Sequence, residues 1–396
     1  GADLVALPEL SLIGYPPRDL LRKDRFVAAA QEAVAELAAA CTDTAALVGS
    51  VRPTPGDAGR ALQNVADLLA GGQVRQVHAK HLLPTYDVFD ETRYFQPGAR
   101  AGRCLDVADR RLGVLICEDL WDAEALGRAL YEADPLAALA GAGADAVLNL
   151  AASPYQVGKA ARREELLTRR ARGIAKPILY VNQVGGNDEL IFDGASCAVD
   201  AAGRIVARAK AFEEDLLLVD LAPPSGRCES TPDELPGLWA ALQLGLRDYV
   251  HKCGFSSVVL GLSGGIDSAV VAALAADALG PENVHGVAMP SRYSSDHSLA
   301  DAAALAGSLG VHYRRVDIEP MHAAFERALG LVLSGPAGET AAENVQARAR
   351  GVVVMAISNA AGHLALATGN KSELSVGYCT LYGDMCGALA PIGDVL

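Results

Sequence analysis

Short apolar runs alternate with helical segments along the first half of the chain. The apolar and β-branched runs predict strands at 4–7, 45–51, 74–80, 111–117, 146–150, 178–182, 195–199 and 215–221. Segments with helical spacing predict helices at 25–40 and 159–173, and Gly71-Gly72 predicts a tight hairpin turn. Hairpins mixed with helices favour an α/β sandwich of stacked layers.

The pattern changes after the Pro-Pro-Ser-Gly break at 223–226. The polar run to 236 predicts a linker, and 238–252 predicts a helix. From 256 onward strand and helix alternate, which is typical of a doubly wound parallel sheet. We therefore expect a first domain at 1–222, a linker at 223–236 and a second domain at 237–396.

Composition narrows the class of protein. The chain has 396 residues, 51% hydrophobic and 21% charged, which suits two globular domains or three and gives no sign of disorder. A formal charge of −14 argues against a nucleic-acid partner, and no apolar run predicts a membrane span. Eight cysteines without a C-x-x-C pair suit the cytoplasm and argue against structural zinc. The chain starts without Met, as if inside a strand, and stops in mid-pattern, so we expect both ends to be incomplete.

The loop at 261–268 joins a predicted strand to a predicted helix. Its glycines let the backbone approach a ligand, the N–H groups of the next helix point toward it, and two serines add hydroxyl donors. The loop predicts a phosphate site, although a Gly-rich turn of an ordinary α/β unit is the alternative; it is not a Walker A loop, because Gly-Lys-Ser/Thr is absent. Its residues are Gly261, Leu262, Ser263, Gly264, Gly265, Ile266, Asp267 and Ser268. The SGG-x-DS pattern resembles the pyrophosphate-binding loop of ATP-pyrophosphatases, which adenylate a substrate and release pyrophosphate.

Reactive side chains follow three apolar runs of the first half. These are Glu9, Lys80 and Cys117. A thiol can act as a nucleophile, a carboxylate as a general base and an ammonium as a stabiliser of an oxyanion. Each also has a structural interpretation, as a turn cap, a surface lysine and a core cysteine respectively. Their joint occurrence favours cysteine-dependent catalysis.

The contexts PE, K-x-x-LP and CED around these residues resemble the nitrilase (carbon–nitrogen hydrolase) superfamily. The resemblance implies an α-β-β-α sandwich with a Glu–Lys–Cys triad. Glu9 would take the thiol proton and return it to leaving ammonia, Cys117 would form a thioester, and Lys80 would stabilise the oxyanion. Glu91 matches a second glutamate that such enzymes place near the lysine, and we expect it to belong to the glutamine-binding residues.

An amino-acid substrate needs an acceptor for its ammonium and donors for its carboxylate. The candidates are Tyr86, Glu118, Ser153 and Lys159. A helix cap for Ser153 and a solvated helix face for Lys159 are the alternatives. The family resemblance described next matches these positions to glutamine binding.

Further motifs follow predicted strands of the second half. We expect Arg292 either to contact ATP phosphates or to form a salt bridge within its loop. Asn344 and Arg348 lie one turn apart on a predicted helix. The sequences EN-x-Q-x-R-x-R, TGNKSE and GY-x-TLYGD, after SGGIDS, resemble the glutamine-dependent NAD synthetase family across nearly the whole chain.

That resemblance implies a Rossmann-like ATP-pyrophosphatase domain. The loop 261–268, Arg292 and Thr368 would bind ATP; Asn344, Arg348 and Glu373 would bind deamido-NAD; and Asp267 and Glu373 would hold Mg²⁺ against the phosphates. The reaction would use glutamine, ATP and deamido-NAD, and the protein would be a homo-oligomer. A lysine that the family has beyond the PIGDV stretch is not in this chain.

Two alternatives stay open at this point. One is another glutamine-fed adenylating amidotransferase with a different acceptor, which the TGNKSE and TLYGD motifs oppose. The other is a non-catalytic nucleotide-binding protein with decayed sites.

Overall fold

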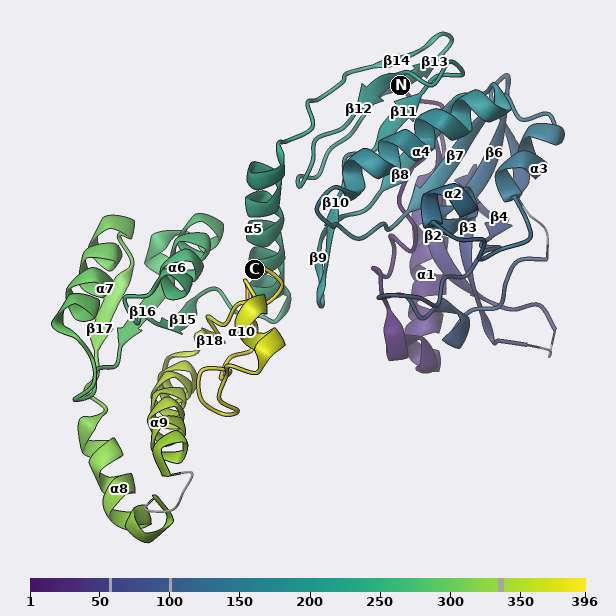
Figure 1. Ribbon diagram of the computed structural model, residues 1–396. Helices are drawn as coiled ribbons and strands as arrows, with labels where there is room; N and C mark the ends of the chain where they lie inside the picture. The colour runs from purple at the N-terminus through teal and green to yellow at the C-terminus, as the bar shows by residue number, and fades with distance from the viewer. Residues whose placement is uncertain (57–58, 100–101, 334–337) are drawn as a thin grey trace. The chain divides into compact units, whose positions relative to one another are not determined.

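The computed structural model describes residues 1–56, 59–99, 102–333 and 338–396 (Figure 1). The chain divides into two compact units, 1–237 and 238–396. Within the described ranges no helix combines the length and the apolar character needed to cross a membrane.

The first unit contains two larger sheets and two short hairpins. One sheet has the order β1 (Leu4–Ala6), β2 (Ala45–Pro53), β3 (Leu62–Ala70), β4 (Gln73–Ala79). The other has the order β12 (Ile205–Arg208), β11 (Cys197–Val199), β8 (Ile178–Asn182), β7 (Ala146–Ala151), β6 (Arg110–Ile116), β5 (Arg103–Val107). The hairpins pair β9 (Val184–Asn187) with β10 (Leu190–Asp193), and β13 (Val219–Leu221) with β14 (Pro224–Gly226).

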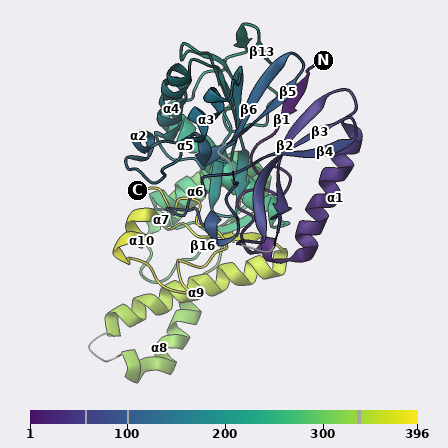
Figure 2. The ribbon, with the colours of Figure 1, turned by 90° about the vertical axis from the view of Figure 1, so that its right-hand side faces the viewer.

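Helices flank these sheets. They are α1 (Asp24–Ala40), α2 (Ala123–Leu126), α3 (Pro135–Gly141) and α4 (Lys159–Ile174), with short 3₁₀ turns η1 (Arg18–Arg22), η2 (Glu91–Arg93) and η3 (Cys117–Leu120). Apolar side chains of both sheets form one core, with Leu47 and Val77 from the first sheet and Val114 and Leu148 from the second. Figure 2 shows α1 lying along the first sheet, where its buried face packs on β2 and β3. The α-β-β-α sandwich is confirmed.

The predicted strand at 215–221 is wrong in its first part. Only Val219–Leu221 forms a strand, while Leu216 and Leu218 are 74% and 70% exposed. Asp215 instead accepts hydrogen bonds from the Lys210 backbone N–H at 2.9 Å and from Arg227. An apolar run that finds no core to pack against does not stay in a sheet. The predicted linker at 223–236 contains β14 and the first turn of α5 (Glu234–Lys252), and the two units divide after Gly237.

The second unit is built on a parallel sheet. Its order is β17 (His312–Arg315), β16 (Val284–Ala288), β15 (Val258–Gly261), β18 (Leu364–Leu366). Its helices are α5, α6 (Ile266–Leu279), α7 (Asp296–Leu309), α8 (Glu319–Leu333), α9 (Gly338–Ala361) and α10 (Lys371–Val376), with the 3₁₀ turn η4 (Pro281–Asn283).

Side chains of β15 alternate between two cores. Val258 and Leu260 pack with α6, whereas Val259 packs with Val353 and Val354 of α9. Successive residues of a strand point to opposite faces of its sheet, so both faces are covered by helices. The predicted doubly wound parallel sheet is therefore confirmed.

Candidate active sites

Glu9 lies just after β1, on a segment that crosses β2 at close range. A Cβ atom at Gly49 would lie 2.2 Å from the Pro8 carbonyl oxygen and 2.4 Å from the Leu10 nitrogen. No real Cβ fits at those distances, so only glycine in β2 lets this segment come down onto the sheet. The Glu9 side chain is fully buried.

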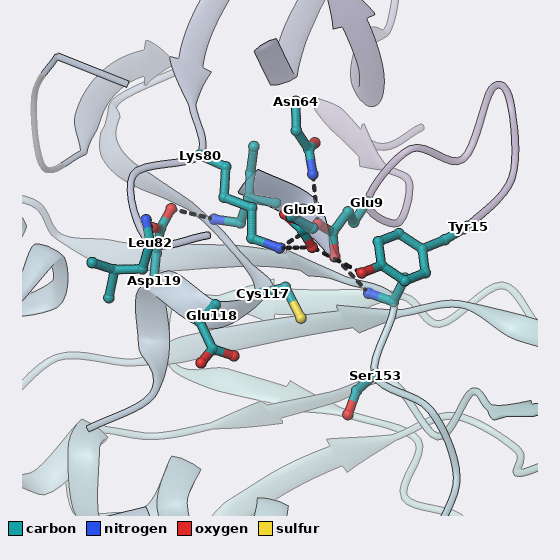
Figure 3. Close-up of polar contacts among 12 residues, drawn as sticks. Glu9, Tyr15, Asn64, Lys80, Leu82, Glu91, Cys117, Glu118, Asp119 and Ser153 are labelled. Atoms are coloured by element: carbon teal, nitrogen blue, oxygen red, sulfur yellow. Dashed lines mark hydrogen bonds and ion pairs between the residues drawn. The ribbon is translucent and has the colours of Figure 1, made fainter. Parts of the chain in front are cut away.

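Glu9 and a second glutamate share the ammonium of Lys80 (Figure 3). Lys80 Nζ donates to Glu9 Oε1 at 2.7 Å and to Glu91 Oε1 at 2.6 Å. The Tyr15 hydroxyl donates to the same Glu91 oxygen at 2.9 Å. All four side chains are buried, and one cation between two carboxylates is a geometry in which electrostatic attraction is strong.

Further donors orient the Glu9 carboxylate. Asn64 Nδ2 donates to Oε1 at 2.6 Å, and the backbone N–H of Ala152, at the end of β7, donates to Oε2 at 3.1 Å. Both oxygens therefore have partners from other strands, which restricts rotation of the carboxylate.

Cys117 begins η3, directly after β6. Its φ is +43°, a left-handed conformation that residues with a side chain rarely adopt, and its carbonyl accepts a hydrogen bond from Asn149 Nδ2 at 3.3 Å. In Figure 3 the sulfur points into the space between Glu118 and Ser153, on the lower side of the group formed by Glu9 and Lys80. The charges of both residues act on the thiol.

Burial and charge decide the protonation states of this cluster. Burial, and secondarily the negative charge of Glu9, raise the pKa of the Cys117 thiol well above its usual value, although Lys80 opposes this shift. Burial lowers the pKa of Lys80, but Glu9 and Glu91 outweigh it, and the net pKa is well above the usual value. Burial, opposed by Lys80, raises the pKa of Glu91 to about 7. The resting site therefore holds a thiol and an ammonium.

Glu118 forms a second polar group beside Cys117. The hydroxyls of Tyr86 and Tyr131 donate to Glu118 Oε1 at 2.7 and 3.0 Å. Burial raises the pKa of Glu118, and burial followed by the Glu118 charge raises the pKa of both tyrosines. Tyr131 was not predicted from the sequence, because it lies outside any strand-end motif, in the irregular segment between α2 and α3.

Ser153 and Lys159 also lie near the thiol. Ser153 is 2% exposed, and its N–H donates to Asn182 Oδ1 at 3.0 Å. Lys159 opens α4, where burial lowers its pKa and the Cys117 charge acts to raise it. Lys159 is half-buried, so it is neither fully solvated nor part of the core.

In the second unit, the loop 261–268 folds back on itself through its two serines. Ser268 Oγ lies 3.0 Å from Ser263 Oγ, accepts from the Ser263 N–H at 3.3 Å and donates to the Gly265 carbonyl at 3.0 Å. Gly264 has φ +83°, and a Cβ there would lie 2.3 Å from the Ser298 carbonyl oxygen. The close approach expected of a glycine loop is thus present, and the loop opens directly onto the N-terminus of α6.

Asn370 connects the two acidic residues predicted to hold a metal. Its Nδ2 donates to Asp267 Oδ1 at 3.1 Å, and its backbone N–H donates to Glu373 Oε2 at 3.2 Å. Thr368 lies in the same segment between β18 and α10. In the described part of the chain no group of three or more His, Cys, Asp or Glu side chains is arranged to hold a metal ion.

Three other predicted residues already have protein partners. Arg292 Nε donates to Glu319 Oε1 at 2.7 Å and its NH2 group to Glu326 Oε2 at 3.1 Å, so the salt-bridge interpretation describes its position. Asn344 Oδ1 accepts from the Thr380 hydroxyl at 2.8 Å. Arg348 Nε donates to the Leu381 carbonyl at 3.1 Å.

Comparison with known proteins agrees with the division of the chain into two units. Family models named carbon-nitrogen hydrolase and NAD synthase match residues 1–228 and 238–396. A glutamine-dependent NAD(+) synthetase of Synechocystis sp. is 49% identical over all of this chain and 73% of its own length, and one of Rhodobacter capsulatus is 45% identical over all of this chain and 70% of its own.

A solved structure gives the same result. The glutamine-dependent NAD+ synthetase of Acinetobacter baumannii, determined with adenosine diphosphate, has a TM-score of 0.91 and 42% identity over all of this chain and 73% of that one. The family models and these relatives together show that the chain belongs to the glutamine-dependent NAD(+) synthetases.

Proposed function

We propose that Cys117, Glu9 and Lys80 hydrolyse glutamine in the first unit of this glutamine-hydrolysing NAD synthase, and that the loop 261–268 uses ATP in the second. The observation that carries the proposal is the buried ammonium of Lys80 shared by two carboxylates beside a buried thiol. A charge cluster of this kind is costly to bury and is typical of a catalytic site.

Glu9 serves as the base for a thiol whose own pKa is too high for it to ionise unaided. The thiol proton moves to Glu9 as sulfur bonds to the amide carbon of glutamine, and Lys80 stabilises the oxyanion. The C–N bond then breaks, Glu9 returns the proton to the leaving nitrogen, and ammonia departs from a thioester. Water, deprotonated by Glu9, cleaves the thioester to glutamate and restores the thiol.

Glu118 is proposed to bind the α-ammonium of glutamine. Two tyrosine hydroxyls hold its carboxylate in place, and the buried setting strengthens the attraction. Lys159 supplies a positive charge for the α-carboxylate. Ser153 lies on the side of Cys117 away from Lys80 (Figure 3). Glu91 keeps the ammonium of Lys80 in position through a second ion pair beside that of Glu9.

In the second unit, the loop 261–268 is proposed to bind the phosphates of ATP, with Thr368 nearby. The nicotinate carboxylate of deamido-NAD attacks the α-phosphorus, and pyrophosphate leaves. Ammonia then attacks the acyl carbon of the adenylate, and AMP leaves with NAD as the product. Asn344, Arg348 and Glu373 are proposed to contact deamido-NAD, and Arg292 must release Glu319 and Glu326 before it can bind a phosphate.

Asp267 and Glu373 fit a Mg²⁺ ion held jointly with phosphates. Both carboxylates contact Asn370, and two protein carboxylates plus substrate oxygens suit this ion. When bound, the ion would neutralise phosphate charge during adenylation. Asp267 and Glu373 supply the hard oxygen ligands, and Asn370 keeps the two side chains at the same edge of the loop.

The remaining proposals concern the protein as a whole. We propose domains at 1–222 and 237–396 and a homo-oligomeric assembly. We also propose a cytoplasmic location, which the eight free cysteines support.

Replacement of the proposed nucleophile tests the assignment. Cys117→Ala should abolish NAD formation from glutamine but leave NAD formation from ammonium unchanged, with AMP and pyrophosphate released in equal amounts. Cys197→Ala is the matched control, because Cys197 is an equally buried thiol of the same unit. Glutamine-dependent synthesis by Cys117→Ala would disprove the assignment. Release of AMP with another carboxylate and not with deamido-NAD would favour a different acceptor.

A further inference from the structure

Asp119 is a buried carboxylate that the proposed chemistry does not use. It is two residues after Cys117, in η3, and its side chain is 0% exposed. It is also an unusual acceptor, because four nitrogen atoms from three parts of the chain surround its two oxygens.

One oxygen holds the segment that follows Lys80. Asp119 Oδ1 accepts from the backbone N–H groups of His81 at 3.0 Å and Leu82 at 2.8 Å. Figure 3 shows Asp119 and Leu82 next to each other, to the left of the Lys80 side chain. These are the first two residues after the lysine, so their position sets where the Lys80 backbone leaves β4.

The other oxygen holds the turn that carries the thiol. Asp119 Oδ2 accepts from the Ile116 N–H at 3.2 Å and lies 2.7 Å from Nε2 of His78. Ile116 immediately precedes Cys117, whose φ of +43° needs support from its surroundings. His78 is 2% exposed and lies on β4, two residues before Lys80.

We infer that Asp119 is a positioning residue that sets the distance between the Lys80 ammonium and the Cys117 thiol. This inference rests on the roles proposed above for those two side chains. One carboxylate holds the backbone just after Lys80, the side chain of His78 two residues before it, and the backbone just before Cys117. The oxyanion formed at the sulfur must lie within hydrogen-bond reach of Nζ, so this distance governs the stabilisation of the transition state and not the binding of glutamine.

A carboxylate is required because every partner on the backbone is a donor. Ionised Asp accepts at both oxygens, whereas Asn accepts at one and carries an NH₂ group at the other position. In Asp119→Asn, the NH₂ group must face either the Ile116 N–H or the N–H groups of His81 and Leu82. One of the two segments is then released, although the side chain keeps its size.

The test compares Asp119→Asn with Asp67→Asn. Asp67 is an equally buried carboxylate of the same unit, and it accepts from Ser50 and Arg52 and from none of the proposed catalytic residues. We expect Asp119→Asn to lower kcat for glutamine hydrolysis about 100-fold, the order of loss that a displacement of ~1 Å produces. KM for glutamine and ammonium-dependent synthesis should stay near the parent values, and alkylation of Cys117 by iodoacetamide should show an altered pH dependence.

Several results would overturn the inference. One is a kcat as high as that of Asp67→Asn; another is a loss that appears only in KM. If Asp119→Asn does not fold, as shown by circular dichroism and loss of a cooperative unfolding transition, His78→Phe replaces it. Phenylalanine removes the contact to Oδ2 and leaves the backbone contacts of Asp119 in place, and an unchanged kcat in this variant would equally refute the proposed role. Retained glutamine-dependent synthesis by Cys117→Ala would instead show that the proposed catalytic assignment has failed.

Discussion

Glu91→Gln tests whether Lys80 is shared by two buried carboxylates. Glu91 Oε1 accepts from both Lys80 and Tyr15, while Oε2 has no hydrogen-bond partner within the described residues. The glutamine side chain introduced at position 91 can keep both contacts at its carbonyl oxygen and place its NH₂ group where Oε2 had no partner. The substitution therefore removes the titratable carboxyl group of residue 91 and changes the shape of the side chain little.

The expected change in unfolding free energy with pH follows from the pKa of Glu91. Burial raises that pKa from 4.5 to about 7, so between these values the folded protein binds a proton that the unfolded chain has released. Stability contributed by the protonated carboxyl is complete below pH 4.5 and is lost as pH rises through 7. A shift of this size corresponds to about 3 kcal/mol of unfolding free energy. Because the side chain of Gln at position 91 does not titrate, the Glu91→Gln variant should not lose this unfolding free energy as the pH rises.

The two tryptophans of the chain allow the first unit to be followed by itself. Trp121 packs against the main core of that unit, and Trp239 belongs to α5. In a Trp239→Phe background, the fluorescence of Trp121 reports denaturant unfolding at a series of pH values. Between pH 4.5 and 7.5, the stability of Glu91→Gln should rise by about 3 kcal/mol relative to its parent. Glu118, whose pKa burial also raises, titrates in both proteins and cancels in the comparison.

Parallel stability curves for the two proteins would refute the reasoning, since Glu91 would then titrate alike in the folded and unfolded states. Tyr15→Phe provides a second check. The Tyr15 hydroxyl favours the ionised form of Glu91, so its removal should raise the pKa of Glu91 further and move the loss of stability to higher pH.

Two further predictions concern the second unit. Gly264→Ala should raise KM for ATP at least 10-fold without changing glutamine hydrolysis, as measured by steady-state kinetics. An alanine at φ +83° costs about 1–2 kcal/mol, and its Cβ would displace the loop from Ser298. Gly280→Ala is the control at φ +87°, where the Cβ meets only the movable Glu282 carboxylate, and an equal effect there would contradict the prediction. Asp267→Asn should raise the Mg²⁺ concentration that gives half-maximal adenylation, measured by pyrophosphate release, whereas Asp277→Asn, on the same helix, should leave it unchanged.

The sequence by itself determined the elements and the kind of chemistry at their ends. The helix at 25–40, the hairpin at Gly71-Gly72 and the parallel sheet of the second half follow from periodicity and turn residues that act over a few positions. The same local logic placed Glu9, Lys80 and Cys117 at strand ends. The strand prediction from periodicity was wrong at 215–218, where an apolar run has no core to pack against.

Tertiary structure alone decided which of these ends meet and how their charges balance. Lys80 contacts Glu9 across 71 positions of the chain, and the Ala152 N–H reaches Glu9 across 143. Arg292, for which the sequence left two interpretations, is paired with Glu319 because α8 brings that carboxylate to it. Periodicity specifies which residues face a core but not which strand ends lie together. The partners and protonation states of buried charges therefore depend on contacts that form only when the sheets pack.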